Sequence, residues 1–462
     1  MQKNDILEGK VVDIGSNGEG IVKQDGTVVF VPFSIDGEKI EYKVLKVKGN
    51  IAFGKLLRVL EKSPFRREPV CPCFTKCGGC NLQHVSYEKQ LDIKRKTIED
   101  AFLKIAKINV KTEEVVTGNG EYRYRNKLQL PVVNVDGKPE IGFYSEYSHR
   151  VVPIDDCIIN AEWTKDIISA FKEYFLLGIK GYDEASGSGD IREVAVKEIG
   201  GNLIITVVTP NSKLKHEEKL VSILKNRIKN VFSLYHNVNE NKNNVIFGER
   251  YRLIYGEPNY GAELLGIKYR IGVTSFMQVN TTVCEKLYKT VSELVGENKD
   301  KTVIDAYSGA GLMTAILSLN AKRAIGIEIV PEAVKLANEL KDSNGLSQKI
   351  TNYLGKCEEI MPDIMKDFSD AVIVLDPPRK GCDRKVIESV KLSGAEKIIY
   401  VSCMPSTLAR DVGLLTGTLK YDGNSIVDGN DDVNFKVEKV IPFDMFPNTK
   451  HIETVVLLKK VI

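Results

Sequence analysis

The C-terminal part of the chain alternates between short apolar runs and amphipathic stretches, and this alternation constrains the fold more than any other feature. From about Ser292 onward, the apolar runs are short and rich in β-branched residues, as buried strands are. They fall at Thr302–Asp305, Ala324–Glu328, Ala371–Leu375 and Lys397–Val401. A helical pattern such as Leu312–Leu319 separates one run from the next. Strands that alternate with helices predict a doubly wound, Rossmann-like α/β sheet.

Polar residues stand where these predicted strands end. The loop DAYSGAG, at Asp305–Gly311, is not the dinucleotide-binding G-x-G-x-x-G and is nearer to the D-x-x-x-G-x-G loop of S-adenosylmethionine (SAM) methyltransferases. Glu328 ends the next strand, where an acidic side chain can hydrogen-bond ribose hydroxyls. Asp376 is followed by two prolines and offers a rigid carboxylate at a third strand end. A stiff loop with an exposed acid is the alternative interpretation of Asp376.

Cys403 lies where the strand Lys397–Val401 gives way to a helix. The helical pattern covers Ser406–Leu415, and Pro405 suits its first turn. The N-terminus of a helix lowers the pKa of a nearby thiol, and the thiolate is the nucleophilic form. A lone cysteine is more often a small buried hydrophobe, so the nucleophile interpretation depends on the neighbours of Cys403.

The last apolar run, Ile452–Lys459, supplies such a neighbour. Methyltransferase sheets of this class finish with one antiparallel strand, and its beginning would lie at the carboxyl edge of the parallel strands. Glu453 would then face Cys403 and Asp376 across the ligand crevice. This set suits methylation of pyrimidine carbon 5, because thiolate addition at carbon 6 activates carbon 5 and a general base removes its proton. The pyrimidine must be flipped out or single-stranded.

Residues 1–59 predict a small β-barrel of the OB-like or TRAM kind. Its strands are expected at Gly9–Ile14, Gly20–Lys23, Thr27–Pro32, Lys39–Val47 and Ala52–Val59. The stretch GEGIVKQDGTVVFVPFSIDGEKI resembles the TRAM domain of RNA-modifying enzymes. A net charge of +3 does not itself indicate nucleic acid, but Glu61–Leu130 carries 14 Lys and Arg against 9 Asp and Glu. This excess fits either a solvated face or a phosphate-facing surface.

Nine cysteines, four of them within ten residues, favour a metal site in a reducing compartment over a disulfide scaffold. Two ligand sets compete. Cys73, Cys77 and Cys80 have the C-x3-C-x2-C spacing of radical-SAM enzymes, whereas Cys71, Cys77 and Cys80 would need a distant fourth thiol, Cys157. A radical-SAM barrel does not follow, so a closed four-thiol site is favoured. Zinc is the alternative to an iron–sulfur cluster there.

Three domains are expected: residues 1–59, a central α+β domain with the cysteine cluster at 60–269, and the catalytic domain at 270–462. Helix Tyr87–Ala106 is a candidate to pack on the catalytic domain. Strands are expected at Tyr122–Val132, Glu140–Tyr144 and Val151–Ile154. No run of 18 apolar residues and no signal peptide is present, which predicts a cytoplasmic protein without a membrane partner. No obligate protein partner is indicated.

Several motifs together resemble those of bacterial RNA uracil-5-methyltransferases, specifically the 23S rRNA branch with a TRAM domain and a 4Fe–4S cluster. They are C-x5-CGGC-x-LQH-x2-Y at Cys71–Tyr87, Cys157, SFMQVN at Ser275–Asn280, DAYSGAG at Asp305–Gly311, IGIE at Ile325–Glu328, LDPPRKG at Leu375–Gly381, VSCMPSTLARD at Val401–Asp411 and DMFPNTKHIETV at Asp444–Val455. The resemblance extends over essentially the full length.

The resemblance implies roles for individual residues. Cys403 would be the nucleophile and Glu453 the general base. The SAM contacts would be Gln278, Tyr307, Glu328 and Asp376. The 4Fe–4S ligands would be Cys71, Cys77, Cys80 and Cys157, which leaves Cys73 as an extra thiol. Related enzymes have Asn or Cys in places where this chain has Met404, Ser308 and Leu312. These departures do not touch the thiol or the base and concern minor SAM contacts.

The expected activity is therefore methylation of carbon 5 of a uridine in 23S rRNA. A cytosine-5 RNA methyltransferase commonly adds a second cysteine in a D-x-P-C loop, where this chain has DPPR at Asp376–Arg379. A tRNA substrate is the next alternative, although the tRNA-directed bacterial relatives typically lack the barrel and the cluster. A radical-SAM methylthiotransferase would carry TRAM at the other end and needs no pair of Cys403 and Glu453. A non-catalytic RNA-binding module is least favoured, because that pair is intact.

Overall fold

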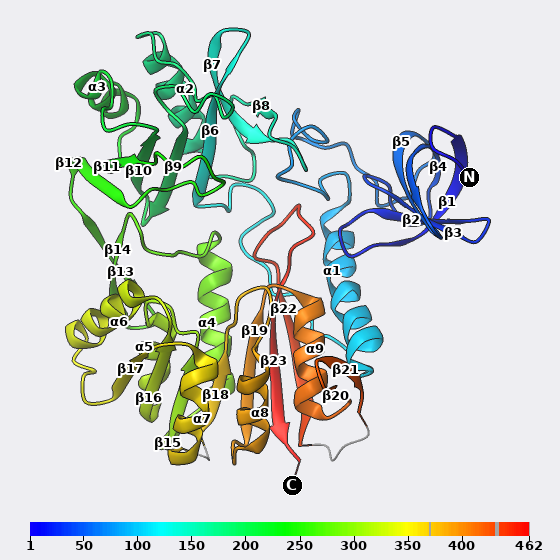
Figure 1. The fold of residues 1–462 in the computed structure, drawn as a ribbon, viewed down its shortest axis with the longest axis vertical. Helices are drawn as coiled ribbons and strands as arrows, with labels where there is room; N and C mark the ends of the chain where they lie inside the picture. The colour runs from blue at the N-terminus through cyan, green and yellow to red at the C-terminus, as the bar shows by residue number, and fades with distance from the viewer. Residues whose placement is uncertain (369–370, 430–433, 462) are drawn as a thin grey trace.

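The computed structural model describes residues 1–368, 371–429 and 434–461, which form three lobes (Figure 1). A small barrel at the N-terminus lies beside helix α1 (Tyr87–Ala101). A mixed sheet forms the second lobe, and the C-terminal sheet forms the third, with the C-terminus at its far end. Within the described ranges, no helix combines the length and the apolar character needed to cross a membrane.

The predicted N-terminal barrel is confirmed. Its strands are β1 (Ile6–Ile14), β2 (Gly20–Gln24), β3 (Thr27–Val31), β4 (Lys39–Lys48) and β5 (Ile51–Glu61), which close in the order β1-β2-β3-β5-β4. Alternate side chains, such as Val29 and Val31, are fully buried inside the barrel. Asp25 and Gly26 both have positive φ, as a two-residue turn between twisted strands requires.

The central lobe is a seven-stranded sheet in the order β12-β11-β10-β9-β6-β7-β8, with two helices against it. Its elements are β6 (Lys127–Val135), β7 (Lys138–Tyr144), β8 (Val151–Pro153), α2 (Trp163–Phe175), β9 (Glu193–Ile199), β10 (Asn202–Thr209), α3 (Glu217–Arg227), β11 (Val231–Val238) and β12 (Arg250–Gly256). Neighbouring strands are antiparallel except for β10 and β11. This α+β arrangement agrees with the class expected for the region.

The strand predicted at Tyr122–Val132 was placed too early, because β6 begins only at Lys127. Arg123 has a φ of 54°, which interrupts the extended backbone. The N–H groups of Arg123 and Arg125 instead donate to the carbonyls of Ile158 and Ile159, both at 2.9 Å. The segment before β6 therefore follows residues 158–160 rather than the sheet.

The C-terminal sheet has the order β17-β16-β15-β18-β19-β23-β22. Its strands are β15 (Asn298–Ala306), β16 (Ala321–Glu328), β17 (Ile350–Leu354), β18 (Val372–Leu375), β19 (Lys397–Ser402), β22 (Phe435–Phe443) and β23 (Glu453–Lys460). The first five strands pair in parallel, and β23 is antiparallel to both β19 and β22. The doubly wound sheet and its antiparallel last strand, both predicted from the sequence, are thus confirmed.

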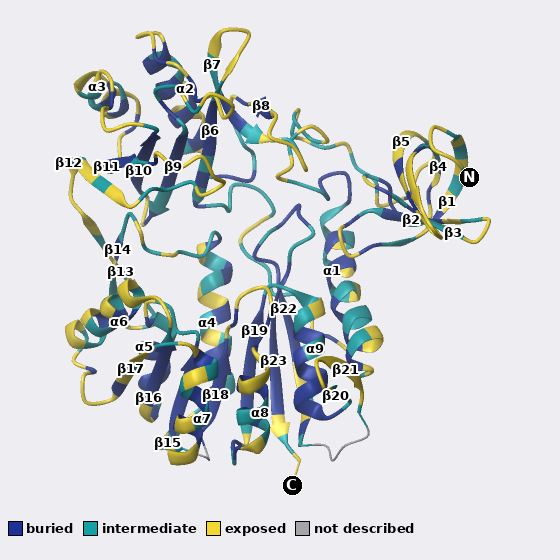
Figure 2. Cartoon of the chain, viewed as in Figure 1, coloured by how far each residue is buried: buried dark blue, intermediate teal, exposed yellow. Residues whose placement is uncertain are grey.

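Helices cover both faces of this sheet, and its central strands β18, β19 and β23 are almost wholly buried (Figure 2). They are α4 (Thr281–Val295), α5 (Leu312–Ser318), α6 (Pro331–Ser343), α7 (Cys357–Asp367), α8 (Arg384–Leu392) and α9 (Pro405–Thr416). Two hairpins complete the lobe, β13 (Asn259–Leu264) with β14 (Ile267–Gly272) and β20 (Leu419–Asp422) with β21 (Ser425–Asp428).

Helix α1 and the π-helix that continues it, η1 (Phe102–Ala106), pack into the core of the C-terminal lobe although they precede the central sheet. Ile98, Phe102 and Ala106 belong to the same buried cluster as Leu408 and Val412 of α9. The fold thus attaches the segment after the barrel to the C-terminal sheet, and this attachment shapes the site described next.

Candidate active site

One large cavity, of about 1240 Å³, lies between the central lobe and the carboxyl edge of the C-terminal sheet. It brings together most of the residues that the sequence singled out. Those that line it are Cys71, Cys77, Cys80, Cys157, Gln278, Tyr307, Asp376, Cys403 and Glu453. Glu328 is not among its lining residues. The carboxylate of Glu328 instead accepts hydrogen bonds from the N–H groups of Gly309 (3.0 Å) and Val330 (2.8 Å).

Strand register places the thiol beside the acid. In the antiparallel pair β19–β23, Ser402 lies opposite Thr454 and Val401 opposite Val455. Continuing the register by one residue sets Cys403 opposite Glu453. Both side chains line the cavity, with Glu453 only 7% exposed. The crevice that the sequence predicted at this edge is therefore present.

The glycine loop after β15 is held against α6. Gly311 has a φ of 78°, and a Cβ built there would lie 2.7 Å from the Cβ of Ala337. Only glycine meets both demands without strain. Asp305, at the end of β15, accepts a hydrogen bond of 2.5 Å from the hydroxyl of Thr314. These contacts hold the loop in place. Tyr307, which belongs to the loop, lines the cavity.

Three carboxyl groups at this edge have raised pKa values. Burial raises the pKa of Asp305 to about 7, and the charge of nearby Asp376 adds to the effect. Asp376 lines the cavity, and desolvation by the surrounding protein raises its pKa to about 7. Burial and the charge of Asp376 raise the pKa of Glu453 to about 8, against the lowering effect of Arg379. Such a cluster favours a cationic ligand, since a positive charge relieves the repulsion.

The pKa of Cys403 is raised, contrary to the expectation from its place before α9. Burial raises it most, and the Glu453 charge raises it further. Arg379 opposes both effects by its charge and by a hydrogen bond to the thiol. Desolvation and the neighbouring acid therefore outweigh the helix N-terminus. A cationic ligand in the cavity would favour the thiolate.

Arg379 is a site residue that the sequence reasoning missed, although it stands in the LDPPRKG motif. Its loop is held by α9: Thr407 donates to the carbonyl of Arg379 (3.0 Å), and Arg410 donates to that of Lys380 (2.9 Å). The buried carboxylate of Asp411 accepts from the N–H of Cys382 at 2.7 Å. The arginine after the two prolines was the available signal, but its proximity to Cys403 depends on these long-range contacts.

The loop that carries Gln278 is held by the central lobe. Asn126 donates through Nδ2 to the carbonyl of Gln278 (3.1 Å) and to the hydroxyl of Thr281 (2.9 Å). Lys197, in β9, donates to the carbonyls of Val273 and Ser275, both at 2.6 Å. Spacing could not reveal either residue, because both act across more than seventy positions of sequence.

The thiols of the cysteine-rich segment lie at the other end of the cavity. Burial raises the pKa of Cys77 to about 11 and that of Cys80 to about 12, and the charges of Cys157 and Cys71 contribute to both. Cys73 lines the same cavity, and all nine cysteines are free thiols. Within the described part of the chain, no three or more His, Cys, Asp and Glu side chains are arranged to hold a metal ion. The predicted ligands thus share one cavity wall but do not form a preassembled site.

Comparison with known proteins agrees with this geometry. Residues 252–461 match the family model of tRNA (uracil-5-)-methyltransferases, and residues 3–57 match the TRAM domain. An RNA methyltransferase of Clostridium acetobutylicum is 36% identical over 100% of this chain and 98% of its own length. One of Halalkalibacterium halodurans is 37% identical over 99% and 98%. Both relatives are described as uncharacterised.

A solved structure resembles almost the whole chain. The Pyrococcus abyssi tRNA (uracil-54, C5)-methyltransferase, in complex with S-adenosyl-L-homocysteine, has a TM-score of 0.77 and 25% identity. The likeness covers 98% of this chain and 99% of that one. The sheet and the cavity at its edge define a SAM-dependent methyltransferase. This chain belongs to the RNA uracil-5-methyltransferase family and carries a TRAM domain at its N-terminal end.

Arg379 lowers the pKa of Cys403 and Glu453 raises it, so substitution of the two residues should change the reactivity of the thiol in opposite directions. Thiolate, not thiol, is alkylated, so a higher pKa moves alkylation to higher pH. Arg379→Leu removes a lowering effect and should slow alkylation of Cys403 several-fold at pH 8. Glu453→Gln removes a raising effect and should speed it. Mass spectrometry of the Cys403 peptide, after timed iodoacetamide treatment across a pH series, measures both rates.

Cys284 in α4 is the internal control, because its pKa is raised by burial and by Glu285 rather than by either substituted residue. Its alkylation rate should not change. Shifts of the same sign in the two variants would contradict the described electrostatics.

Proposed function

We propose that this enzyme methylates carbon 5 of a uridine in 23S rRNA through a covalent adduct between Cys403 and carbon 6. The observation that carries the proposal is the register of β19 and β23, which aligns a thiol with a carboxyl group at the cavity wall. Uracil carbon 5 is a poor nucleophile, and a thiol paired with a base answers that chemical need. The family match supports the same reaction class.

In the proposed reaction, Cys403 acts first. Its thiolate bonds to carbon 6, and the π electrons of the carbon 5–carbon 6 bond shift toward carbon 5 and the carbonyl oxygen. When bound, SAM would supply an electrophilic methyl group to carbon 5; the S–CH3 bond breaks, and its electron pair stays on the sulfur of the departing S-adenosylhomocysteine. Glu453 then removes the proton from carbon 5. The electron pair of that C–H bond restores the double bond, the C–S bond breaks, and the pair leaves on the sulfur of Cys403.

SAM would be held by Gln278, Tyr307, Glu328 and Asp376. The carboxyl groups of Asp305, Asp376 and Glu453, all with raised pKa values, favour a sulfonium cation at this edge. Glu328 would contact the ligand while it holds the glycine loop, because each carboxylate oxygen has a second lone pair. Arg379, beside Cys403, would stabilise the thiolate.

A uridine of tRNA is the second candidate substrate, and one observation favours it. The Pyrococcus structure is titled as a tRNA-modifying enzyme, and its likeness covers 98% of this chain. That coverage includes the N-terminal barrel, so the barrel alone does not exclude a tRNA substrate, whereas the expectation from the sequence concerned bacterial tRNA enzymes. The resemblance of the cysteine motif to the 23S rRNA branch remains the argument for rRNA. A cytosine target is less favoured because Arg379 occupies the last position of the D-x-P-C loop.

Cys71, Cys77, Cys80 and Cys157 would hold a 4Fe–4S cluster, with zinc as the alternative. The support is chemical: the four thiols share one cavity wall and interact electrostatically. When bound, the cluster supplies a crosslink between the segment 71–80 and the turn that follows β8. Thiolate-based methyl transfer moves no electrons, so these cysteines would act on shape rather than on redox chemistry.

The three proposed domains would have separate roles. The barrel at 1–59 and the central domain at 60–269 would bind RNA, and the domain at 270–462 would carry SAM and catalysis. We expect the enzyme to act in the cytoplasm on RNA without a membrane or an obligate protein partner.

The function predicts transfer of labelled methyl from SAM to unmodified large-subunit rRNA. The label should appear as 5-methyluridine with the wild type and with Cys284→Ala, a control thiol outside the cavity wall, and should be lost with Cys403→Ala. Nucleoside analysis and site mapping identify the product. Label only in tRNA would overturn the substrate but keep the mechanism. Methylation that survives Cys403→Ala would contradict the mechanism itself.

The cysteine proposal predicts that anaerobically purified protein contains iron and acid-labile sulfide. Cys80→Ala should lose both and should bind RNA at least several-fold more weakly, with SAM affinity retained. Cys284→Ala should keep both. Metal analysis, RNA binding by filter retention and SAM binding by calorimetry measure these quantities. Zinc without sulfide would select the alternative metal, and undiminished RNA methylation by Cys80→Ala would contradict the structural role.

A further inference from the structure

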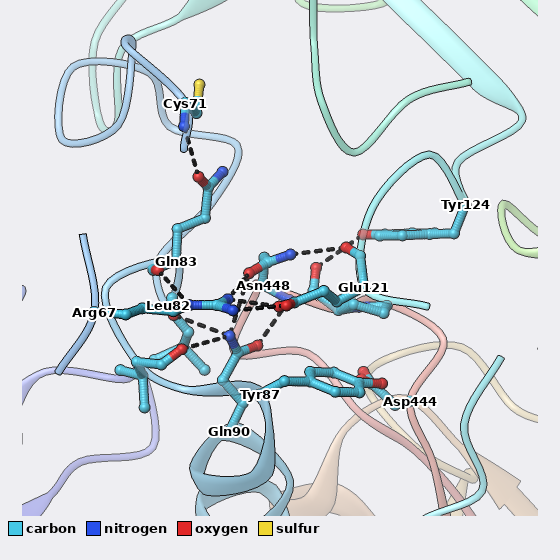
Figure 3. A network of polar contacts seen from close by, with 12 residues as sticks. Arg67, Cys71, Leu82, Gln83, Tyr87, Gln90, Glu121, Tyr124, Asp444 and Asn448 are labelled. Carbon is cyan, nitrogen blue, oxygen red and sulfur yellow. Dashed lines mark hydrogen bonds and ion pairs between the residues drawn. The ribbon is translucent and has the colours of Figure 1, made fainter. Parts of the chain in front are cut away.

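The loop between β22 and β23 leads directly into Glu453, and residues from outside the C-terminal sheet hold it (Figure 3). At its beginning, the carboxylate of Asp444 accepts from Lys94 at 2.5 Å and from Tyr87 at 2.8 Å, both on α1. Lys94 also donates to the carbonyl of Phe446 at 3.0 Å. Lys94 and Asp444 are both fully buried, so this end of the loop is fixed to α1.

Asn448, in the middle of the loop, is fully buried and bonded through its backbone. Its N–H donates to Oε1 of Gln90 at 2.9 Å. Its carbonyl accepts from the N–H groups of Asn81 (3.1 Å) and Leu82 (3.0 Å). Asn81 directly follows Cys80, so the cysteine-rich segment is attached to this residue.

The side-chain amide of Asn448 is also fully hydrogen-bonded. Its Oδ1 accepts from Arg67 (3.0 Å) and from Nε2 of Gln90 (3.2 Å), and its Nδ2 donates to the carbonyl of Glu121 (2.8 Å). Arg67 is itself fixed by a bidentate pair with Glu121 at 2.6 and 2.5 Å, as Figure 3 shows. A buried amide with every polar group bonded is expensive to displace, because each lost partner leaves an unsatisfied group.

The network continues to the first cysteine. Arg67 donates through Nε to the carbonyl of Gln83 (3.0 Å), and the side-chain oxygen of Gln83 accepts from the N–H of Cys71 (3.3 Å). Asn448 therefore joins helix α1, the segment that contains Cys71 and Cys80, and the stretch before β6 at a single point (Figure 3).

Four residues, 449–452, separate Asn448 from Glu453. The hydroxyl of Thr449, the first of them, donates to the carbonyl of Phe446 (2.8 Å) and accepts from the N–H of His451 (3.2 Å). Thr449, His451 and Glu453 line the cavity, whereas Asn448 does not. A shift of Asn448 would therefore reach Glu453 through a short, internally bonded stretch.

We propose that Asn448 is a positioning residue for Glu453, through which helix α1 and the cysteine-rich segment hold the general base against the adduct on Cys403. The proposal rests on the function proposed above. Asn448 cannot touch substrate itself, because it is fully buried and lies outside the cavity wall. Loss of the Asn448 side chain should slow release of the methylated RNA from Cys403, because release requires removal of the carbon 5 proton by a correctly placed base.

The test separates positioning from general stability. Asn448 has a φ of 65°, so Asn448→Gly removes the side chain and keeps the backbone conformation. Gln90→Met, which keeps the bulk of the side chain while removing its bonds to Asn448, is the second variant should the first not fold. Asn239→Gly is the matched control: Asn239 is equally buried and donates to the carbonyls of Val245 and Ile246, but it lies in the central lobe away from the cavity.

Each enzyme is mixed with SAM labelled in the methyl group and with its RNA substrate, quenched in denaturant and run on a denaturing gel. Methylated RNA that remains bonded to Cys403 migrates with the protein. Glu453→Gln should accumulate this adduct, because carbon 5 has its methyl group but keeps its proton. Asn448→Gly and Gln90→Met should accumulate about tenfold more adduct than wild type and turn over about tenfold more slowly, as misplacement of a catalytic group predicts. Their SAM affinity and their KM for RNA should not change.

Asn239→Gly should resemble wild type in adduct level even where its unfolding temperature falls as far as that of Asn448→Gly. Adduct in Glu453→Gln but not in Asn448→Gly or Gln90→Met would overturn the positioning role. A lack of adduct in Glu453→Gln as well would instead refute the proposed function on which the inference rests.

Discussion

The antiparallel pairing of β19 with β23 is the constraint on which the site depends. Every other strand of the sheet that reaches the cavity arrives with its carboxyl end, whereas β23 begins there. A strand that begins at this edge can present its first residue, Glu453, to Cys403, the residue that directly follows β19. Desolvation of both groups then follows from the same packing, and it explains why both pKa values are raised.

Segments that precede the catalytic sheet in sequence take part in its construction. Helix α1 packs among α9 and the sheet, and the loop before β23 is bonded to α1 and to the cysteine-rich segment rather than to its own lobe. The loop of Gln278 is likewise held by Asn126 and Lys197 of the central lobe. The cavity is therefore bounded by parts of the chain that have to fold together.

Local pattern predicted a great deal of this molecule. The apolar runs predicted the strands of the C-terminal sheet and the helices between them, and the turn residues predicted the barrel. The positions of Cys403, Asp376 and Glu453 at strand ends followed from the predicted topology. Failures arose where distant contacts decide the outcome. Arg123, held by Asp156, turns away from the strand that its sequence suggests. Arg379 and Asn448 stand in motifs, but their contacts with Cys403 and with helix α1 depend on segments far away in sequence. The pKa of Cys403 is set by burial and by Glu453 rather than by the helix that follows.

In the proposed reaction, carbon 5 of a uridine exchanges its proton for a methyl group while carbon 6 is bonded to Cys403. The most direct measurement uses substrate RNA that carries tritium at carbon 5 of uridine together with SAM labelled with carbon-14 in its methyl group. We expect one tritium released to water for each methyl group transferred, with neither event in Cys403→Ala. Methyl transfer without tritium release would contradict it, because the methyl group would then have gone to another atom.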